Sequence, residues 1–328
     1  MKTINLTLPA ILFSQLIIAG CTEKSADARI AEKQLSDQFP TVISATDTSI
    51  APQSIINIED WTACNSDILC QSSNTDRLFY RLDPVTFCTV DSFGTSGQGP
   101  DEFIFPKIVR SNNGATILVD IAKNKFISND VETIVSPNEY GYNSPFDVAY
   151  PIVGFTELIG SDRACYLIDV NTSEIVDSIS FKSSEMPSPK IAVNFRAASN
   201  GSHVVIAREF LDEITIIDLD ENKQFDKVTR FVGQGQPSAR KPYYVGVECG
   251  KDHFYVLSMI DVSFGSNGEP SGKCSIDIYD YAATPVAKIE VDYFPRRILL
   301  DADRNRLLAL SAFDDDIHII DLPRLLFE

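Results

Sequence analysis

The sequence predicts an all-β protein that contains six copies of one unit of four antiparallel strands. After residue 50 the chain consists mainly of short runs of Val, Ile, Leu, Phe and Tyr separated by turn residues, which is typical of strands. A block made of an apolar strand, an acidic or Asn-rich turn and a second strand recurs six times. A second turn precedes most blocks, so each unit holds four strands in about 40 to 50 residues, the size of a propeller blade. We therefore expect a six-bladed β-propeller over residues 51–328.

The turns of the recurring block mark the order of the units along the chain. They lie at Asp83, Asn129, Asn171, Asp220, Ala283 and Leu322. The third unit has the weakest pattern, between residues 150 and 180, and the fifth carries a Gly-, Ser- and Asn-rich insertion, residues 261–273, that predicts an exposed hairpin loop. The ring could be closed either by the last strand, LLFE, or by a strand from residues 21–50.

The N-terminus has the layout of a bacterial export signal. Lys2 precedes an apolar run over residues 8–20, which is shorter than the about 20 residues that a membrane-spanning helix needs. Ala19 and Gly20 stand before Cys21 and resemble the lipobox of bacterial lipoproteins, in which the cysteine is acylated. We expect a signal peptide over residues 1–20, a lipid on Cys21 and a flexible tether over residues 21–50 that leads into a first strand around TVIS, residues 41–44; an ordinary secretory signal is the alternative.

Charge and cysteine content limit the function classes. The net charge of −18 repels phosphate backbones, so nucleic acid is not an expected partner. Of the seven cysteines, Cys64 and Cys70 lie close enough in sequence to bridge two strands across a turn. The sequence contains no CxxC motif or paired His/Cys spacing, so we expect no zinc site.

The most specific internal segment, residues 93–130, begins with a glycine-rich stretch. Its first part, FGTSGQGPDEFIFP, contains Gly94, Gly97, Gly99, Pro100, Phe103 and Pro106, and its later part contains Asp120, Asn124, Lys125 and Phe126. These residues resemble the NHL repeat and the related TolB-like six-bladed propellers found among lipoproteins of the Bacteroides group. A partial second copy keeps Gly233 and Gly235. The resemblance implies a structural connection between blades. A phosphate-binding loop is disfavoured because no Lys-Ser/Thr pair follows the glycines and a strand rather than a helix is expected downstream.

Candidate chemistry is sparse. Neither His203 nor His253 lies in a metal-binding motif, and DADRN (residues 301–305) lacks the Gly and Glu of a calcium loop and predicts a hairpin turn. Two connections are aromatic and could cover a neighbouring blade or grip a sugar or peptide: Tyr140, Tyr142, Phe146 and Tyr150 in one, Tyr243 and Tyr244 in the other. A weak calcium site is conceivable at Asp314, Asp315 and Asp316, where solvated turn carboxylates are the simpler interpretation.

These patterns favour a non-enzymatic binding or scaffold lipoprotein of the cell envelope. It would attach to the membrane through its lipid and present one propeller face to a protein, peptide or glycan, without a cofactor. The alternative is a propeller-lactonase-like or sugar-active enzyme with calcium in the central channel, whose ligands would come from several blades. A third hypothesis is a structural part of a larger envelope complex.

Overall fold

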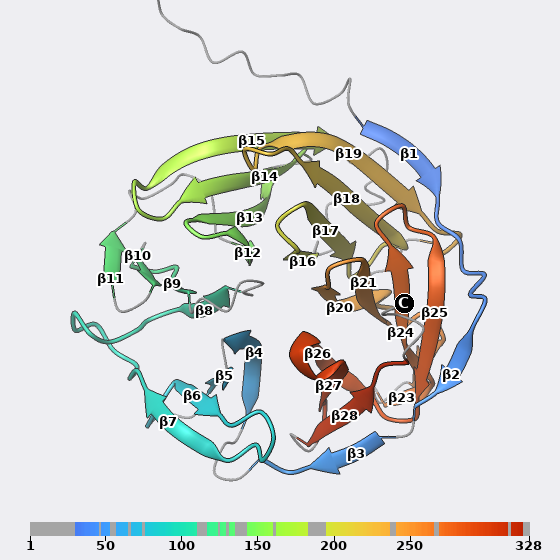
Figure 1. The fold of residues 1–328 in the computed structure, drawn as a ribbon, viewed down its shortest axis with the longest axis horizontal. Coiled ribbons are helices and arrows are strands. Elements are labelled where there is room, and N and C mark those ends of the chain that lie inside the picture. The colour runs from blue at the N-terminus through green and yellow to red at the C-terminus, as the bar shows by residue number, and fades with distance from the viewer. Residues whose placement is uncertain are drawn as a thin grey trace, which may run out of the picture.

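The predicted six-bladed β-propeller is confirmed. The computed structural model describes residues 30–45, 47–52, 57–64, 67–73, 76–109, 117–123, 125–128, 131–134, 143–159, 162–182, 195–236, 241–265, 269–313 and 316–323. In these residues six sheets surround a common axis (Figure 1). The described part of the chain contains no helix that is long and apolar enough to span a membrane.

Each blade starts with an inner strand beside the axis and adds strands outward. Blades one to three contain β4 (Ile58–Cys64), β5 (Asp67–Ser72), β6 (Phe79–Leu82) and β7 (Thr89–Phe93); β8 (Pro106–Val109), β9 (Ile117–Asp120), β10 (Lys125–Ser128) and β11 (Val131–Ile134); β12 (Asn143–Ala149), β13 (Ile152–Ile159), β14 (Asp162–Asp169) and β15 (Glu174–Lys182). Blades four to six contain β16 (Phe195–Ser199), β17 (His203–Arg208), β18 (Glu213–Leu219) and β19 (Phe225–Val232); β20 (Tyr244–Cys249), β21 (His253–Ser258), β24 (Cys274–Asp280) and β25 (Pro285–Val291); β26 (Pro295–Asp301), β27 (Arg306–Ser311) and β28 (Ile317–Asp321). The third unit, weakest in sequence, thus has all four strands, and the insertion of unit five contains the hairpin of β22 (Val262–Phe264) and β23 (Pro270–Gly272).

Three N-terminal strands run along the outside of blades four, five and six (Figure 1). We call them the belt: β1 (Ile30–Gln34), β2 (Val42–Ser44) and β3 (Asp47–Ile50). β1 and β2 pair in parallel with β19 and β25, and β3 pairs antiparallel with β28 as the fourth strand of blade six. The ring is therefore closed by a strand from the N-terminal region. The first strand expected around TVIS corresponds to β2, and residues 30–34 and 47–50, expected in the tether, also bond to the sheet edges. Residues 1–29, with Cys21, lie outside the described residues, as does the LLFE segment.

Side-chain contacts hold the belt on the ring. Glu32 forms an ion pair with Arg230, whose side chain is only 7% exposed. Leu35 is buried in the apolar cluster between blades four and five, and the Phe39 ring meets the Tyr279 ring edge-on at 5.2 Å. The belt thus contributes a charged group and backbone hydrogen bonds, and the segment between β1 and β2 contributes the apolar groups.

The core consists of six apolar clusters, one between each pair of neighbouring blades. Both faces of a blade pack against other blades, which is why middle strands such as β24 and β27 are buried at nearly every position rather than alternating. At the seam of blades six and one, Trp61 is fully buried with Leu308 and Leu310. Ring closure therefore buries apolar side chains, as the contacts between the other neighbouring blades do.

The recurring acidic turn has one structural role in four blades. The Oδ1 atom of an aspartate accepts hydrogen bonds from backbone N–H groups two to four residues later, and a non-glycine residue with positive φ follows in the same turn. These aspartates are Asp83, Asp169, Asp220 and Asp280, and the positive-φ residues are Phe87, Ser173, Lys223 and Ala283. At Asp83 the accepted hydrogen bonds lower the pKa of the carboxyl below its usual value. The predicted turns at Asp83, Asn171, Asp220 and Ala283 are thus confirmed.

Candidate binding face

The strand order divides the loops between two faces of the ring. Because neighbouring strands are antiparallel, the turns from first to second and from third to fourth strand lie on one face, which we call the hairpin face. The turns from second to third strand and the links between blades lie on the other, which we call the connector face. The glycine motif, the β22–β23 hairpin and the start of every inner strand belong to the connector face.

The glycine motif forms the link between blades one and two. Gly94 has a φ of +72°, a left-handed conformation that favours glycine, and an added Cβ there would lie 2.9 Å from the Phe79 ring. The backbone N–H of Gly99 donates to Glu102 Oε2 at 2.7 Å, and Phe103 is buried against Phe79. Pro100 lies within this link, and Pro106 begins β8, so the motif acts as the expected structural connection.

Asp120 fastens that link to blade two. Its carboxylate accepts hydrogen bonds from the backbone N–H groups of Ile104 at 2.8 Å and Phe105 at 3.1 Å. The Lys125 ammonium donates to the Pro100 carbonyl at 2.8 Å. Phe126 is buried between blades two and three, and Asn124 lies outside the described residues.

The second copy of the glycine motif is bound by Asp212, a residue that the sequence did not single out. Asp212 accepts a hydrogen bond from the Gly235 N–H at 2.8 Å on Oδ2 and from the Tyr244 hydroxyl at 2.5 Å on Oδ1. Gly233 lies so close that an added Cβ would be 1.9 Å from Asp212 Oδ2. The role of Asp212 could have been predicted from its position in the unit. Both Asp212 and Asp120 occur where the second strand of a unit ends and the connection to the third begins.

Four of the aromatic and histidine candidates have structural roles. Phe146, Tyr243 and Tyr244 are buried, and burial raises the pKa of the Tyr244 hydroxyl well above its usual value. The His203 ring stacks on Tyr281 of the next blade at 4.2 Å. Tyr150 is exposed on the hairpin face, whereas Tyr140 and Tyr142 lie outside the described residues.

Cys64 and Cys70 do not form the bridge that their spacing allowed. Both are buried, and neither is in a disulfide. In the register of β4 and β5, Cys70 lies opposite Trp61 and Cys64 opposite Asp67. Successive side chains in a strand alternate between faces, so Cys70 belongs to the cluster between blades six and one and Cys64 to the cluster between blades one and two. The two thiols are on opposite faces of one sheet, where a disulfide is sterically excluded.

The acidic turns considered as calcium sites are described only in part. In them, no group of three or more His, Cys, Asp and Glu side chains is arranged to hold a metal ion. DADRN forms the predicted turn, in which Asp301 pairs with Arg304 and Arg306. Asp314 and Asp315 of the conceivable calcium turn lie outside the described residues.

The exposed phenylalanines gather on the connector face. Among the described residues, the phenylalanines in the exposed class are Phe105, Phe264 and Phe313, at 63%, 42% and 70% exposure. Phe105 precedes β8, Phe264 ends β22, and Phe313 lies in the turn between β27 and β28. Phe264 and Phe313 thus lie in loops of the neighbouring blades five and six, and Phe105 lies in the link that leads into blade two.

Arginines occupy the inner edge of the same face. Arg196 is the second residue of β16, and Arg296 and Arg297 are the second and third of β26. Arg196 Nε donates to the Val245 carbonyl at 3.1 Å, and its guanidinium lies 4.0 Å from Glu209. Arg297 Nε lies 3.7 Å from Asp60 Oδ1.

Comparison with known proteins relates this chain to others by fold. No family model and no curated protein matches the sequence. A protein of Bacteroides fragilis NCTC 9343 described as exported shares 14% identity at a TM-score of 0.52, over 89% of this chain and 98% of that one. U3-55K shares 9% identity at 0.51, over 84% and 98%, and the β-propeller domain of Cps50 (Swd1) from Myceliophteria thermophila shares 10% at 0.51, over 85% and 100%. These likenesses show that the chain has a β-propeller fold with an exported bacterial protein among its structural neighbours.

Proposed function

We propose that this chain is a lipid-anchored, non-enzymatic binding or scaffold protein of the bacterial cell envelope that presents its connector face to a protein, peptide or glycan. The export-type N-terminus with Cys21 and the exported structural neighbour support the location. The resemblance of the glycine motif to TolB-like and NHL-repeat lipoproteins supports the same class.

The observation that carries the binding face is the placement of the exposed phenylalanine rings, whereas the exposed Tyr150 lies on the hairpin face. Exposed apolar side chains that cluster on one part of a surface mark interaction sites, whereas scattered ones need no explanation. Phe105, Phe264 and Phe313 share the connector face, while the exposed rim residues are aliphatic. Aromatic rings also contribute strongly to binding energy at protein interfaces and can stack on sugars.

Site-specific photo-cross-linking in the cells that make the protein tests this proposal. A photoreactive residue replaces Phe105, Phe264 or Phe313, and matched controls carry it on the rim at Val42, Val90 or Val176, which are 58%, 63% and 41% exposed. We expect a discrete adduct from the connector-face positions and none from the rim. Mass spectrometry of the adduct distinguishes a protein or peptide from a glycan. Equal labelling of both sets, or none at the phenylalanines, would contradict the proposal.

A further inference from the structure

The loops of blades five and six form one connected part of the connector face. Val262 of β22 is part of an apolar cluster against which Phe294 packs from the link that leads into blade six. The Phe294 ring meets the exposed Phe313 ring edge-on at 6.2 Å. Phe264 follows Val262 by two residues and so lies on the same side of β22. We call the described part of these segments the five–six surface: residues 259–265, 269–273, 291–295, 312, 313 and 316.

Backbone contacts hold both exposed rings of this surface in place. The N–H group of the residue before Phe313 donates to the Phe294 carbonyl at 2.9 Å, and the N–H group of Phe313 donates to Ser311 Oγ at 3.3 Å. Phe264 pairs with Pro270 in the ladder of β22 and β23. An exposed ring on a fixed backbone loses little conformational entropy when it binds, so rings of this kind contribute strongly to binding energy.

Carboxylates accompany these two rings. The described residues of the five–six surface include four carboxylates and one lysine, which are Asp261, Glu269, Asp292 and Asp316, and Lys273. The Lys273 ammonium donates to Glu290 Oε2 at 2.6 Å, so this cation is already paired. The link around Phe105 differs, because residues 99–107 and 120–125 carry three carboxylates and three lysines. The excess of negative charge therefore accompanies the exposed rings of blades five and six and not Phe105.

An aromatic ring beside carboxylates is suited to a cationic side chain with an apolar stem. Lysine and arginine can place their methylene groups and their charge over a ring face while the charge also pairs with a carboxylate. A phenylalanine ring has no hydrogen-bonding group for a sugar hydroxyl, and the negative charge repels an anionic ligand.

From this combination of charge and exposed rings we infer that the five–six surface binds a polypeptide segment that carries lysine or arginine beside apolar side chains. The apolar side chains of the segment would pack on Phe264 and Phe313, and its cations would pair with the carboxylates around them. The inference rests on the proposed binding role of the connector face and narrows the ligand to one chemical class, a basic and apolar polypeptide.

Fluorescence anisotropy of labelled synthetic peptides, titrated with the detergent-solubilised full chain, tests the inference. The probes are a peptide of alternating lysine and leucine, one of alternating glutamate and leucine, and one of alternating lysine and serine, and detergent alone serves as the blank. We expect the lysine–leucine peptide to bind at about 0.15 M salt and the glutamate–leucine peptide not to bind. The lysine–serine peptide should bind about 10-fold more weakly or worse, because it lacks apolar side chains.

Variants of the rings locate the binding on the five–six surface. Phe264→Ser and Phe313→Ser should each weaken binding of the lysine–leucine peptide about 10-fold. Val90→Ser is the matched control, because Val90 is 63% exposed on the rim and should have no influence on the affinity.

Variants of the carboxylates test the electrostatic part and do not alter the rings. Asp261→Lys and Asp292→Lys should each weaken binding of the lysine–leucine peptide, because both carboxylates are exposed on the five–six surface. Glu221→Lys changes the net charge equally but lies in an exposed turn of the hairpin face, and it should leave the affinity nearly unchanged. If a serine variant fails to fold, these variants still decide the inference.

Equal binding of the lysine–leucine and glutamate–leucine peptides would overturn the inference, as would equal weakening by Val90→Ser or Glu221→Lys. The proposed function would remain intact, because a glycan or an acidic peptide cross-linked at the phenylalanines would still identify the connector face as the binding face. Conversely, binding of the basic peptide without any adduct in cells would contradict the proposed function and not the preference of the five–six surface.

Discussion

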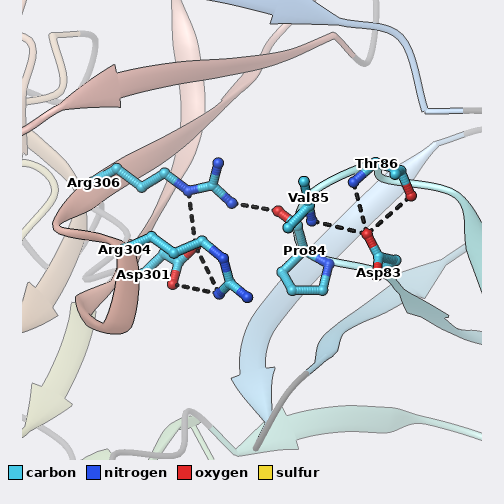
Figure 2. Close-up of polar contacts among 7 residues, drawn as sticks. All are labelled: Asp83, Pro84, Val85, Thr86, Asp301, Arg304 and Arg306. Atoms are coloured by element: carbon cyan, nitrogen blue, oxygen red, sulfur yellow. Dashed lines mark hydrogen bonds and ion pairs between the residues drawn. The ribbon is translucent and has the colours of Figure 1, made fainter.

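Arg306 of blade six donates a hydrogen bond to the carbonyl oxygen of Pro84 in blade one, across the seam that closes the ring (Figure 2). The same guanidinium donates to Asp301 Oδ2 at 2.8 Å and lies over the Phe87 ring at 5.6 Å. Pro84 belongs to the turn that Asp83 caps, where Asp83 Oδ1 accepts from the Thr86 N–H at 2.7 Å. A local turn motif thus presents the carbonyl to which a distant blade binds.

Replacement of Arg306 should destabilise the closed ring. Arg306→Met removes the contact to Pro84 and one partner of Asp301, whose side chain is 8% exposed, and we expect a loss of about 2 to 3 kcal/mol in unfolding free energy. Arg304→Met is the matched control: Arg304 also pairs with Asp301 but is 35% exposed, so its loss should cost about 1 kcal/mol or less. Denaturant unfolding measures both, and an equal effect would contradict the role of Arg306 at the seam.

The belt should have two separable roles. Deletion of residues 30–45 removes β1, β2 and the buried Leu35 but keeps six four-stranded blades, so the protein should fold with a lower Tm. Deletion of residues 30–50 also removes β3, and blade six then has three strands and an unpaired β28 edge. We expect this chain to lose its cooperative thermal transition or to aggregate, as seen by circular dichroism and light scattering. Equal melting of the two deletions would show that β3 is not the closing strand.

Acidification should weaken the contact between blades four and five. Burial lowers the pKa of His203 below its usual 6.5, and the nearby Asp218 opposes this shift. The folded state therefore binds fewer protons than the unfolded state, so stability is complete above about pH 6.5 and falls as the pH drops below it toward the folded pKa. His203→Phe keeps a ring against Tyr281 and cannot titrate. Its Tm should fall less than that of the parent between about pH 7.5 and 5.5; identical profiles would contradict a role for His203.

The lipid anchor depends on one thiol. Cys21→Ser should release the protein from membranes and abolish incorporation of a labelled fatty acid, because the thiol is the acyl acceptor in the expected lipobox. Cys88→Ser is the control, since Cys88 is an exposed free thiol on the ring and should have no influence. Membrane partition of the Cys21→Ser protein, with label retained, would contradict the anchor.

The strand-turn-strand units could be predicted from the sequence because the interactions that make them are local. The turn aspartates accept hydrogen bonds from backbone groups within four residues, so a short stretch of sequence is enough to predict the turn. They are Asp83, Asp169, Asp220 and Asp280. Gly94 likewise has a left-handed φ that its residue type accommodates. Six such units of propeller-blade length indicated the fold class.

Contacts between distant segments were decided only by the tertiary structure. β3 joins β28 from the opposite end of the chain, and a sequence of four residues does not identify its partner edge. Cys64 and Cys70 are near in sequence but lie on opposite faces, because strand register and not spacing sets the face of each side chain. The exposed phenylalanines share the connector face because the antiparallel order of each blade places the loops between its second and third strands on the same face as the links between blades. The sequence by itself therefore determined the unit, and the packing of six units determined the candidate site.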